Sequence, residues 1–130
     1  MPYILHIETS TMQCSVSVSY KGEHIASKQL LVNEFIHGQK LHVFIKDIIE
    51  KIKIKTTDLS AVAVSKGPGS YTGLRIGVAA AKGICFAQDI PLIGINTLEI
   101  MVAPFFNKNE YDYLIPMLDA RRMEVYSAIF

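Results

Sequence analysis

The chain has 130 residues, of which 50% are hydrophobic and 19% are charged. A chain of this length and composition can bury a single hydrophobic core, and it is too apolar to be intrinsically disordered. The formal net charge is +1 and no lysine or arginine cluster stands out, which argues against strong independent binding to nucleic acid, because such binding neutralises several phosphates.

The N-terminal segment and the cysteines indicate the compartment. The first apolar strand is short and contains His6 and Glu8, so it does not resemble a signal peptide, and no apolar run approaches the roughly 20 residues of a membrane span. We therefore expect a cytoplasmic protein that does not bind membranes. Cys14 and Cys85 lie far apart in apolar segments without a Cys-x-x-Cys motif, which predicts buried free thiols.

The spacing of apolar residues predicts an α/β unit. Three alternating strands form an antiparallel meander, and the strands that follow are separated by helices, which implies parallel pairing. We therefore expect a mixed five-stranded sheet with helices on both faces. The predicted strands are 3–8, 14–20, 24–32, 59–65 and 92–95, and the predicted helices are 37–53, 73–88 and a short one from Thr97.

The junction before the second helix has the sequence Lys66-Gly-Pro-Gly-Ser-Tyr-Thr-Gly-Leu-Arg-Ile-Gly77. Gly67-Pro68-Gly69 predicts a rigid turn that lets the backbone approach a ligand or another chain, and Ser70 or Thr72 can cap the helix. Helix N-termini can bind phosphate, yet this spacing is neither a dinucleotide-binding fingerprint nor a P-loop. A tight turn and a ligand site therefore both remain open.

The end of the chain repeats its beginning. Leu118-Asp119-Ala120 aligns with Ile7-Glu8-Thr9, and Val125 aligns with Cys14, with an offset of 111 in both places (119 − 8 and 125 − 14). An acidic residue that ends a strand before a short hairpin is how each half of the actin-like fold opens. We expect residues 1–110 to form a first half and residues 111–130 to be the opening hairpin of a truncated second half, although two similar hairpins could also arise by coincidence.

Several segments together resemble the bacterial TsaB (YeaZ) family, a branch of the actin-like superfamily. They are ILHIETSTMQCSVSV from Ile4, the segment with His37 and Leu41, AVAVSKGPGSYTGLRIG from Ala61, PLIGINTLE from Pro91 and LDARRMEVY from Leu118. The resemblance implies a ribonuclease H-like, actin-like fold that is duplicated in the intact family. It also implies a non-catalytic scaffold subunit in the synthesis of tRNA N6-threonylcarbamoyladenosine, the modified adenosine next to the anticodon.

The resemblance further implies which molecules this chain contacts. The partners are the catalytic paralogue TsaD and the P-loop ATPase TsaE, with a homodimer in their absence and tRNA contacted only indirectly. Neither a cofactor nor a metal is expected on this chain, and ATP belongs to the partner subunits.

The second helix has few residues suited to water. Its only charges between Gly73 and Gln88 are Arg75 and Lys82, and its apolar residues point in several directions. One face can cover the sheet, and the rest requires the preceding helix, a second half of the fold or another chain. The resemblance implies dimerisation through both helices, so the expected partner-binding residues are Leu41, Phe44, Ile45, Ile48, Arg75, Ile76, Ala79 and Lys82.

An alternative function is that of an ATP-binding phosphotransferase of the same superfold. Glu8, Thr9 and Ser10 would then face the metal and phosphates, and Gly67 and Gly69 would lie near the nucleotide. The turn from Glu8 to Thr11 has no glycine that would let its backbone approach phosphate, so a purely hydrogen-bonded turn is the competing interpretation.

Metal and peptidase sites are disfavoured. His37 and His42 are five residues apart, which separates them by roughly 140° around a regular helix, so the two imidazoles cannot converge on one ion. This spacing also argues against a metallopeptidase, and His6 and His24 are expected to be sheet residues. The group Asp119, Arg121, Arg122 and Glu124 is interpreted as a salt-bridged turn, or alternatively as a contact with a partner or RNA.

Overall fold

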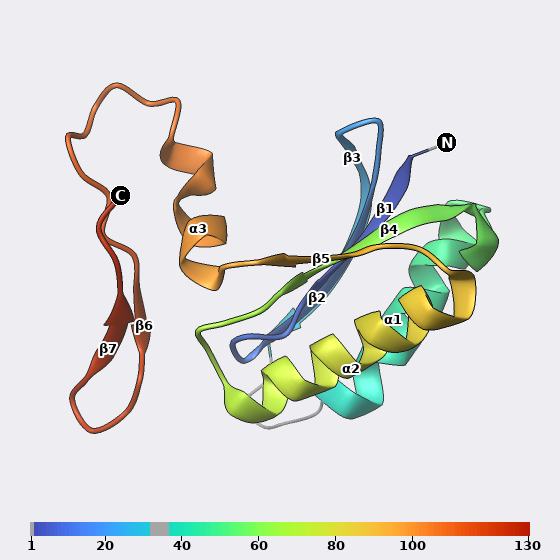
Figure 1. The fold of residues 1–130 in the computed structure, drawn as a ribbon, viewed down its shortest axis with the longest axis horizontal. Helices are drawn as coiled ribbons and strands as arrows, with labels where there is room; N and C mark the ends of the chain where they lie inside the picture. Colours follow the sequence, from blue (N-terminus) through green and yellow to red (C-terminus); the bar gives the residue numbers. More distant parts are fainter. Residues whose placement is uncertain (1, 32–36) are drawn as a thin grey trace.

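The computed structural model describes residues 2–31 and 37–130. Within these ranges, a mixed five-stranded sheet has the order β3-β2-β1-β4-β5, and β6 and β7 form a separate hairpin (Figure 1). The strands are β1 (Tyr3–Glu8), β2 (Gln13–Tyr20), β3 (Glu23–Leu31), β4 (Leu59–Ser65), β5 (Leu92–Ile95), β6 (Met117–Asp119) and β7 (Val125–Ser127). The helices are α1 (His37–Lys51), α2 (Tyr71–Gln88) and α3 (Thr97–Val102), with short 3₁₀ turns at Thr56–Asp58 and Ala103–Phe105.

The predicted meander is confirmed, because β2 pairs antiparallel with both β1 and β3. Alternation places Leu5 opposite Val18 and Ile7 opposite Val16 on the buried face, while the serines between them point to the other face. Val32, the predicted last residue of the third strand, lies outside the described residues. The pattern of the meander therefore already separates a core face from a polar face.

The parallel half of the sheet also follows the prediction. β4 pairs in parallel with β1 and with β5, and its residues from Ala61 to Ser65 are all buried. Side chains on both faces of this central strand are buried, and burial on both faces favours apolar residues, which explains the continuous apolar run from Ala61 to Val64.

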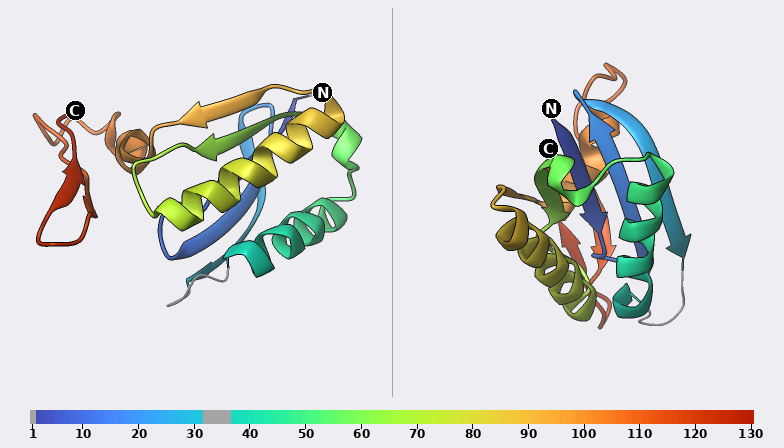
Figure 2. Two further views of the ribbon diagram at one scale, coloured as in Figure 1. Left: turned by 60° about the horizontal axis from the view of Figure 1, so that its bottom comes forward. Right: turned by 90° about the vertical axis from the view of Figure 1, so that its right-hand side faces the viewer.

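Both long helices lie on one face of the sheet (Figure 2), whereas we expected helices on both faces. Helix α1 packs against β2 and β3, and α2 packs against β4 and β1. The crossovers from β3 to β4 and from β4 to β5 run in the same direction across the sheet. Since such crossovers are right-handed, both helices must fall on the same side. The short α3 contributes Ile100 to the rim of the opposite face.

The C-terminal hairpin has the predicted position. β6 ends at Asp119 as β1 ends at Glu8, and β7 begins at Val125, which the offset of 111 aligns with Cys14. Backbone hydrogen bonds of 2.9 Å in both directions between Leu114 and Phe130 close the hairpin. That this hairpin opens a second half of the fold remains a prediction.

Candidate functional site

The turn from Glu8 to Thr11 is held by hydrogen bonds within itself and to the neighbouring strand β4. The Oε1 atom of Glu8 accepts from the Ser10 backbone N–H at 2.9 Å, from the Ser10 hydroxyl, and from the Ser65 hydroxyl at 2.9 Å. Thr9 and Ser10 are both buried, at 0% and 2% exposure. The polar groups that we considered for phosphate and metal are therefore engaged in holding the turn together, as the hydrogen-bonded interpretation predicted.

The same turn is fastened to the start of α2. The Ser70 backbone N–H donates to the Ser10 carbonyl at 2.6 Å, and the Thr9 hydroxyl donates to the Gly73 carbonyl at 2.6 Å. Of the two predicted capping residues, Ser70 is the cap, and its hydroxyl accepts from the Gly73 N–H at 3.2 Å. The carboxyl end of β1 and the amino end of α2 thus form one junction.

The glycine turn is shaped by contact with that junction. Gly69 has φ +156°, and a Cβ built on it would lie 2.5 Å from the Ser10 carbonyl oxygen. Gly67 has φ +113°, in the region that favours glycine, and its carbonyl accepts from the Thr97 N–H at 2.9 Å. Close approach to the Ser10 backbone therefore accounts for Gly69, and the positive φ accounts for Gly67, the two glycines that we had considered for a nucleotide.

Four of the expected partner-binding residues are core residues of this chain. Burial leaves Leu41 0%, Phe44 5%, Ile45 7% and Ile48 2% exposed, because they form the α1 stripe that covers the sheet. This is a correction to the expected surface: these side chains support α1 from beneath and present nothing to a partner.

The other four expected residues lie on or beside the outer side of α2. Arg75, Ala79 and Lys82 are exposed, and Ile76 is half-buried, with its Cδ1 atom 3.8 Å from a Cβ built on Gly38 of α1. Helix α1 therefore covers part of α2, as one of the alternatives held, and leaves the rest open.

Two aromatic residues that were absent from the expected set extend this surface. Phe86 is 91% exposed and Tyr71 is 74% exposed, at opposite ends of α2. The Arg75 guanidinium lies 5.3 Å from the centre of the Tyr71 ring. We define the α2 outer face as Tyr71, Arg75, Ala79, Lys82, Gly83 and Phe86. Helical spacing places these residues on one side, which is the signal that identifies them from sequence.

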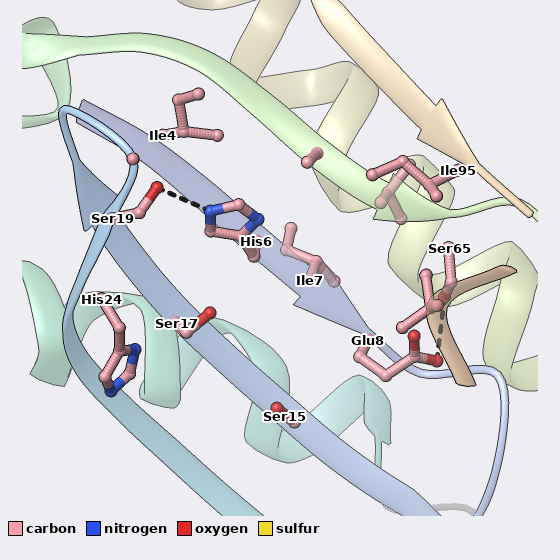
Figure 3. Close-up of a pocket in the computed structure, with 14 residues that line it drawn as sticks. Ile4, His6, Ile7, Glu8, Ser15, Ser17, Ser19, His24, Ser65 and Ile95 are labelled. Atoms are coloured by element: carbon pink, nitrogen blue, oxygen red, sulfur yellow. Dashed lines mark hydrogen bonds between the residues drawn. The ribbon is translucent and has the colours of Figure 1, made fainter. Parts of the chain in front are cut away.

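The sheet face opposite the helices carries a hollow of about 660 Å³ (Figure 3). His6 and Glu8 of β1 and the serines of β2 give it a polar side, and Ile4, Ile95 and Ile100 give it an apolar side. His6 Nε2 lies 2.8 Å from the Ser19 hydroxyl. Burial, together with neighbouring His24, lowers the pKa of His6. The sheet positions expected for both histidines are confirmed, since His6 is on β1 and His24 is on β3.

Both cysteines are free and buried, as predicted. Burial raises the pKa of the Cys14 thiol and, against a weaker opposing effect of a backbone hydrogen bond with Val62, that of Cys85. Each thiol is therefore less reactive than a free cysteine.

Residues 2–31 and 37–130 contain no group of three or more metal-binding side chains placed to hold an ion. Of the two helical histidines, His42 is exposed.

The charged hairpin turn is held by its backbone. Asp119 Oδ1 accepts from the Arg121 N–H at 2.8 Å, and the Ala120 N–H donates to the Glu124 carbonyl at 2.9 Å. We expected a salt-bridged turn, but in the described part of the chain these four charged side chains form no ion pair with one another. The three consecutive residues from Arg121 to Met123 have positive φ. The same described part has no helix that combines the length and the apolar character needed to cross a membrane.

Comparison with known proteins agrees with the fold. A Pseudomonas aeruginosa structure described as YeaZ superposes with a TM-score of 0.89 at 27% identity, covering 100% of this chain and 60% of that one. Thermus thermophilus RuvC superposes with a TM-score of 0.52 at 10% identity, covering 78% of this chain and 68% of RuvC, which shows the fold alone. The ribonuclease H-like α/β fold that the sequence resemblance implied is therefore confirmed.

Sequence comparison identifies the family. The model of the TsaD family, described as tRNA N6-adenosine threonylcarbamoyltransferase, matches residues 34–129. The tRNA threonylcarbamoyladenosine biosynthesis protein TsaB of Escherichia coli K12 is 37% identical over 125 residues, which are 96% of this chain and 53% of that protein. The chain thus spans about half the length of the curated relatives it matches. We conclude that it belongs to the TsaB (YeaZ) family of tRNA threonylcarbamoyladenosine biosynthesis proteins, within the wider TsaD family.

Proposed function

We propose that this protein is a non-catalytic scaffold subunit in the synthesis of tRNA N6-threonylcarbamoyladenosine, and that it binds and activates the catalytic paralogue TsaD in the cytoplasm. The P-loop ATPase TsaE completes the complex, ATP is bound on the partner subunits, and tRNA is contacted only through them. In the absence of the paralogue, a second copy occupies the same surface. Family membership supports the pathway, and the α2 outer face supports the mode of action.

Gly83 is the observation that carries the proposal. It is exposed within α2, and apart from the adjoining backbone of α2 no atom of the described residues lies within 4 Å of a Cβ built on it. A glycine inside a helix destabilises it by about 1 kcal/mol relative to alanine. No contact within the described chain compensates for this loss. Close approach of another helix would explain why no side chain stands there.

The surroundings of Gly83 support the same conclusion. Phe86, one turn away, is almost fully exposed, and exposed Ala79 adds a second small residue on the same side. Large exposed aromatic residues next to small ones are typical of a helix that packs against a partner, since aromatic anchors dominate the energy of protein interfaces. Such an interface would cover α2 where α1 leaves it open.

Two further observations support a role without catalysis. The carboxylate of Glu8 and the hydroxyls of Thr9 and Ser10 make hydrogen bonds inside the chain, which leaves the turn poorly suited to hold metal and phosphates. The thiols of Cys14 and Cys85 are buried, and burial keeps them protonated. The phosphotransferase alternative therefore has less support than the scaffold.

The test is a pull-down of the full-length protein with its catalytic paralogue, comparing wild type with Gly83→Gln. Glutamine adds uncharged bulk at a position that is open in this chain, so the variant should be at least as stable as wild type, yet it should lose most of the complex. Ser27→Gln is the matched control, because Ser27 is exposed on β3 and pairs with Ser17, on the sheet face opposite the helices. Equal binding by the Gly83 variant would place the interface elsewhere, and no binding by wild type would refute the scaffold role.

A further inference from the structure

The charge of α2 has one sign only. Along its eighteen residues the charged side chains are Arg75 and Lys82, and both are exposed. Seven residues separate them by about 10.5 Å along the helix and leave them within about 20° of each other around its axis. The α2 outer face therefore presents two cations in line and no carboxylate.

Neither cation is neutralised by the rest of the described chain. The ion pair found in residues 2–31 and 37–130 joins Lys28 to Asp47, at 2.6 Å, on the far side of α1. The exposed Lys46 and Glu50 of α1 lie one helical turn apart and offset each other. Stacking on the Tyr71 ring keeps the Arg75 guanidinium on the surface of α2. Its charge, like that of Lys82, is available to a partner.

We propose that Arg75 and Lys82 select the partner of the α2 outer face, favouring a paralogue helix that carries carboxylates and opposing a second copy of this chain. The inference rests on the proposed function, in which both compete for the same surface. Complementary charges across an interface contribute to specificity and to the rate of encounter more than to affinity.

The geometry of self-association explains the opposing effect. If two copies pair their α2 helices antiparallel about an axis near Ala79, Arg75 of each faces Lys82 of the other. If the helices run parallel and in register, each cation faces its own equivalent. In both arrangements α2 offers no carboxylate to compensate, so the interface gathers four like charges. An acidic partner helix converts the same two positions into attractive pairs.

Neutralising the cations should therefore act in opposite directions on the two complexes. The experiment uses the full-length protein with Arg75→Gln and Lys82→Gln combined. Its affinity for the paralogue and its self-association, by analytical ultracentrifugation, are measured at about 50 and about 500 mM salt, where screening differs strongly. We expect binding of the paralogue to weaken about three- to ten-fold at low salt and to lose its salt dependence, while self-association becomes several-fold tighter. The matched control is Lys108→Gln with Arg122→Gln, which removes the same charge at positions that belong to neither α1 nor α2.

Each result has a distinct meaning. If wild type binds the paralogue equally well at both salt concentrations, or the double variant self-associates more weakly than wild type, the charge selection is wrong while the scaffold proposal stands. If the control pair gives the same changes as the helix pair, net charge is responsible and the assignment to α2 is wrong. If wild type does not bind the paralogue at all, both proposals fail.

Discussion

The hydroxyl of Thr9 donates a 2.6 Å hydrogen bond to the carbonyl of Gly73, which joins the end of β1 to the first turn of α2. One turn further on, a Cβ built on Gly77 would lie 2.2 Å from the Thr9 Oγ1 atom. The turn and the helix thus meet at a distance that only a glycine permits. This contact fixes how α2 crosses the sheet and hence where its outer face points.

Gly77→Ala should destabilise the fold, because the added methyl group overlaps the Thr9 side chain. Overpacking of this kind costs about 1–3 kcal/mol in the free energy of unfolding. Urea denaturation monitored by circular dichroism measures the change. Gly83→Ala is the matched control on the same helix: beyond the adjoining backbone of α2, no atom of the described residues lies within 4 Å of its Cβ, so alanine should stabilise the protein by about 0.5–1 kcal/mol. Equal effects of the two substitutions would contradict the assigned contact.

Thr9→Val tests the hydrogen bond itself, since valine keeps the shape of threonine and removes the donor. The Gly73 carbonyl would lose a buried partner, and the free energy of unfolding should fall by about 1–3 kcal/mol. Thr9→Ser retains the hydroxyl and should recover much of the loss. If valine and serine give the same stability, the hydroxyl contributes nothing and the junction is held by packing alone.

His6 should make the stability depend on pH. Burial and His24 lower its pKa in the folded protein below the ordinary value of 6.5, so the unfolded chain binds a proton more readily. The stability that neutral His6 contributes is therefore complete above about 6.5, the pKa of the unfolded chain, and is lost as the pH falls through the folded pKa. The free energy of unfolding should accordingly rise with pH up to and slightly above 6.5. His6→Gln, which can still bond to Ser19, should flatten this rise when denaturation is measured from pH 5 to 8. A slope that is unchanged in the variant would assign the dependence to other groups.

The sequence predicted the elements well because each carries a local signal. Alternation identified the meander, and the hairpin recurs at the predicted offset. The expectation of helices on both faces was wrong for α1 and α2, which share one face, because their placement depends on the strand order, and the periodicity of a single helix does not contain that order.

The site was harder to predict for a related reason. The apolar stripe of α1 was assigned to a partner, yet Leu41 and Ile48 are buried by the sheet of the same chain. A helical stripe reveals that a face is covered without revealing what covers it. By contrast, α2 has more apolar residues than one face can hold, and Phe86 remains exposed after the sheet and α1 are in place. Only the apolar side chains that the chain's own fold leaves exposed indicate contact with another molecule.

Phe86→Ser gives the sharpest separation between folding and binding. The side chain is 91% exposed, so its loss should change the free energy of unfolding by no more than about 0.5 kcal/mol. If Phe86 anchors the paralogue, binding should weaken by about 2 kcal/mol, or roughly thirty-fold, as for other aromatic anchors of interfaces. Tyr113→Ser is the control, because Tyr113 is also an exposed aromatic, at 72%, but lies before the C-terminal hairpin. Isothermal titration with the paralogue measures the affinity of the two full-length variants, and urea denaturation measures their free energy of unfolding. Because an exposed phenylalanine gains little from its own fold, undiminished affinity in Phe86→Ser would leave the exposure of this residue without a cause and would remove α2 from the interface.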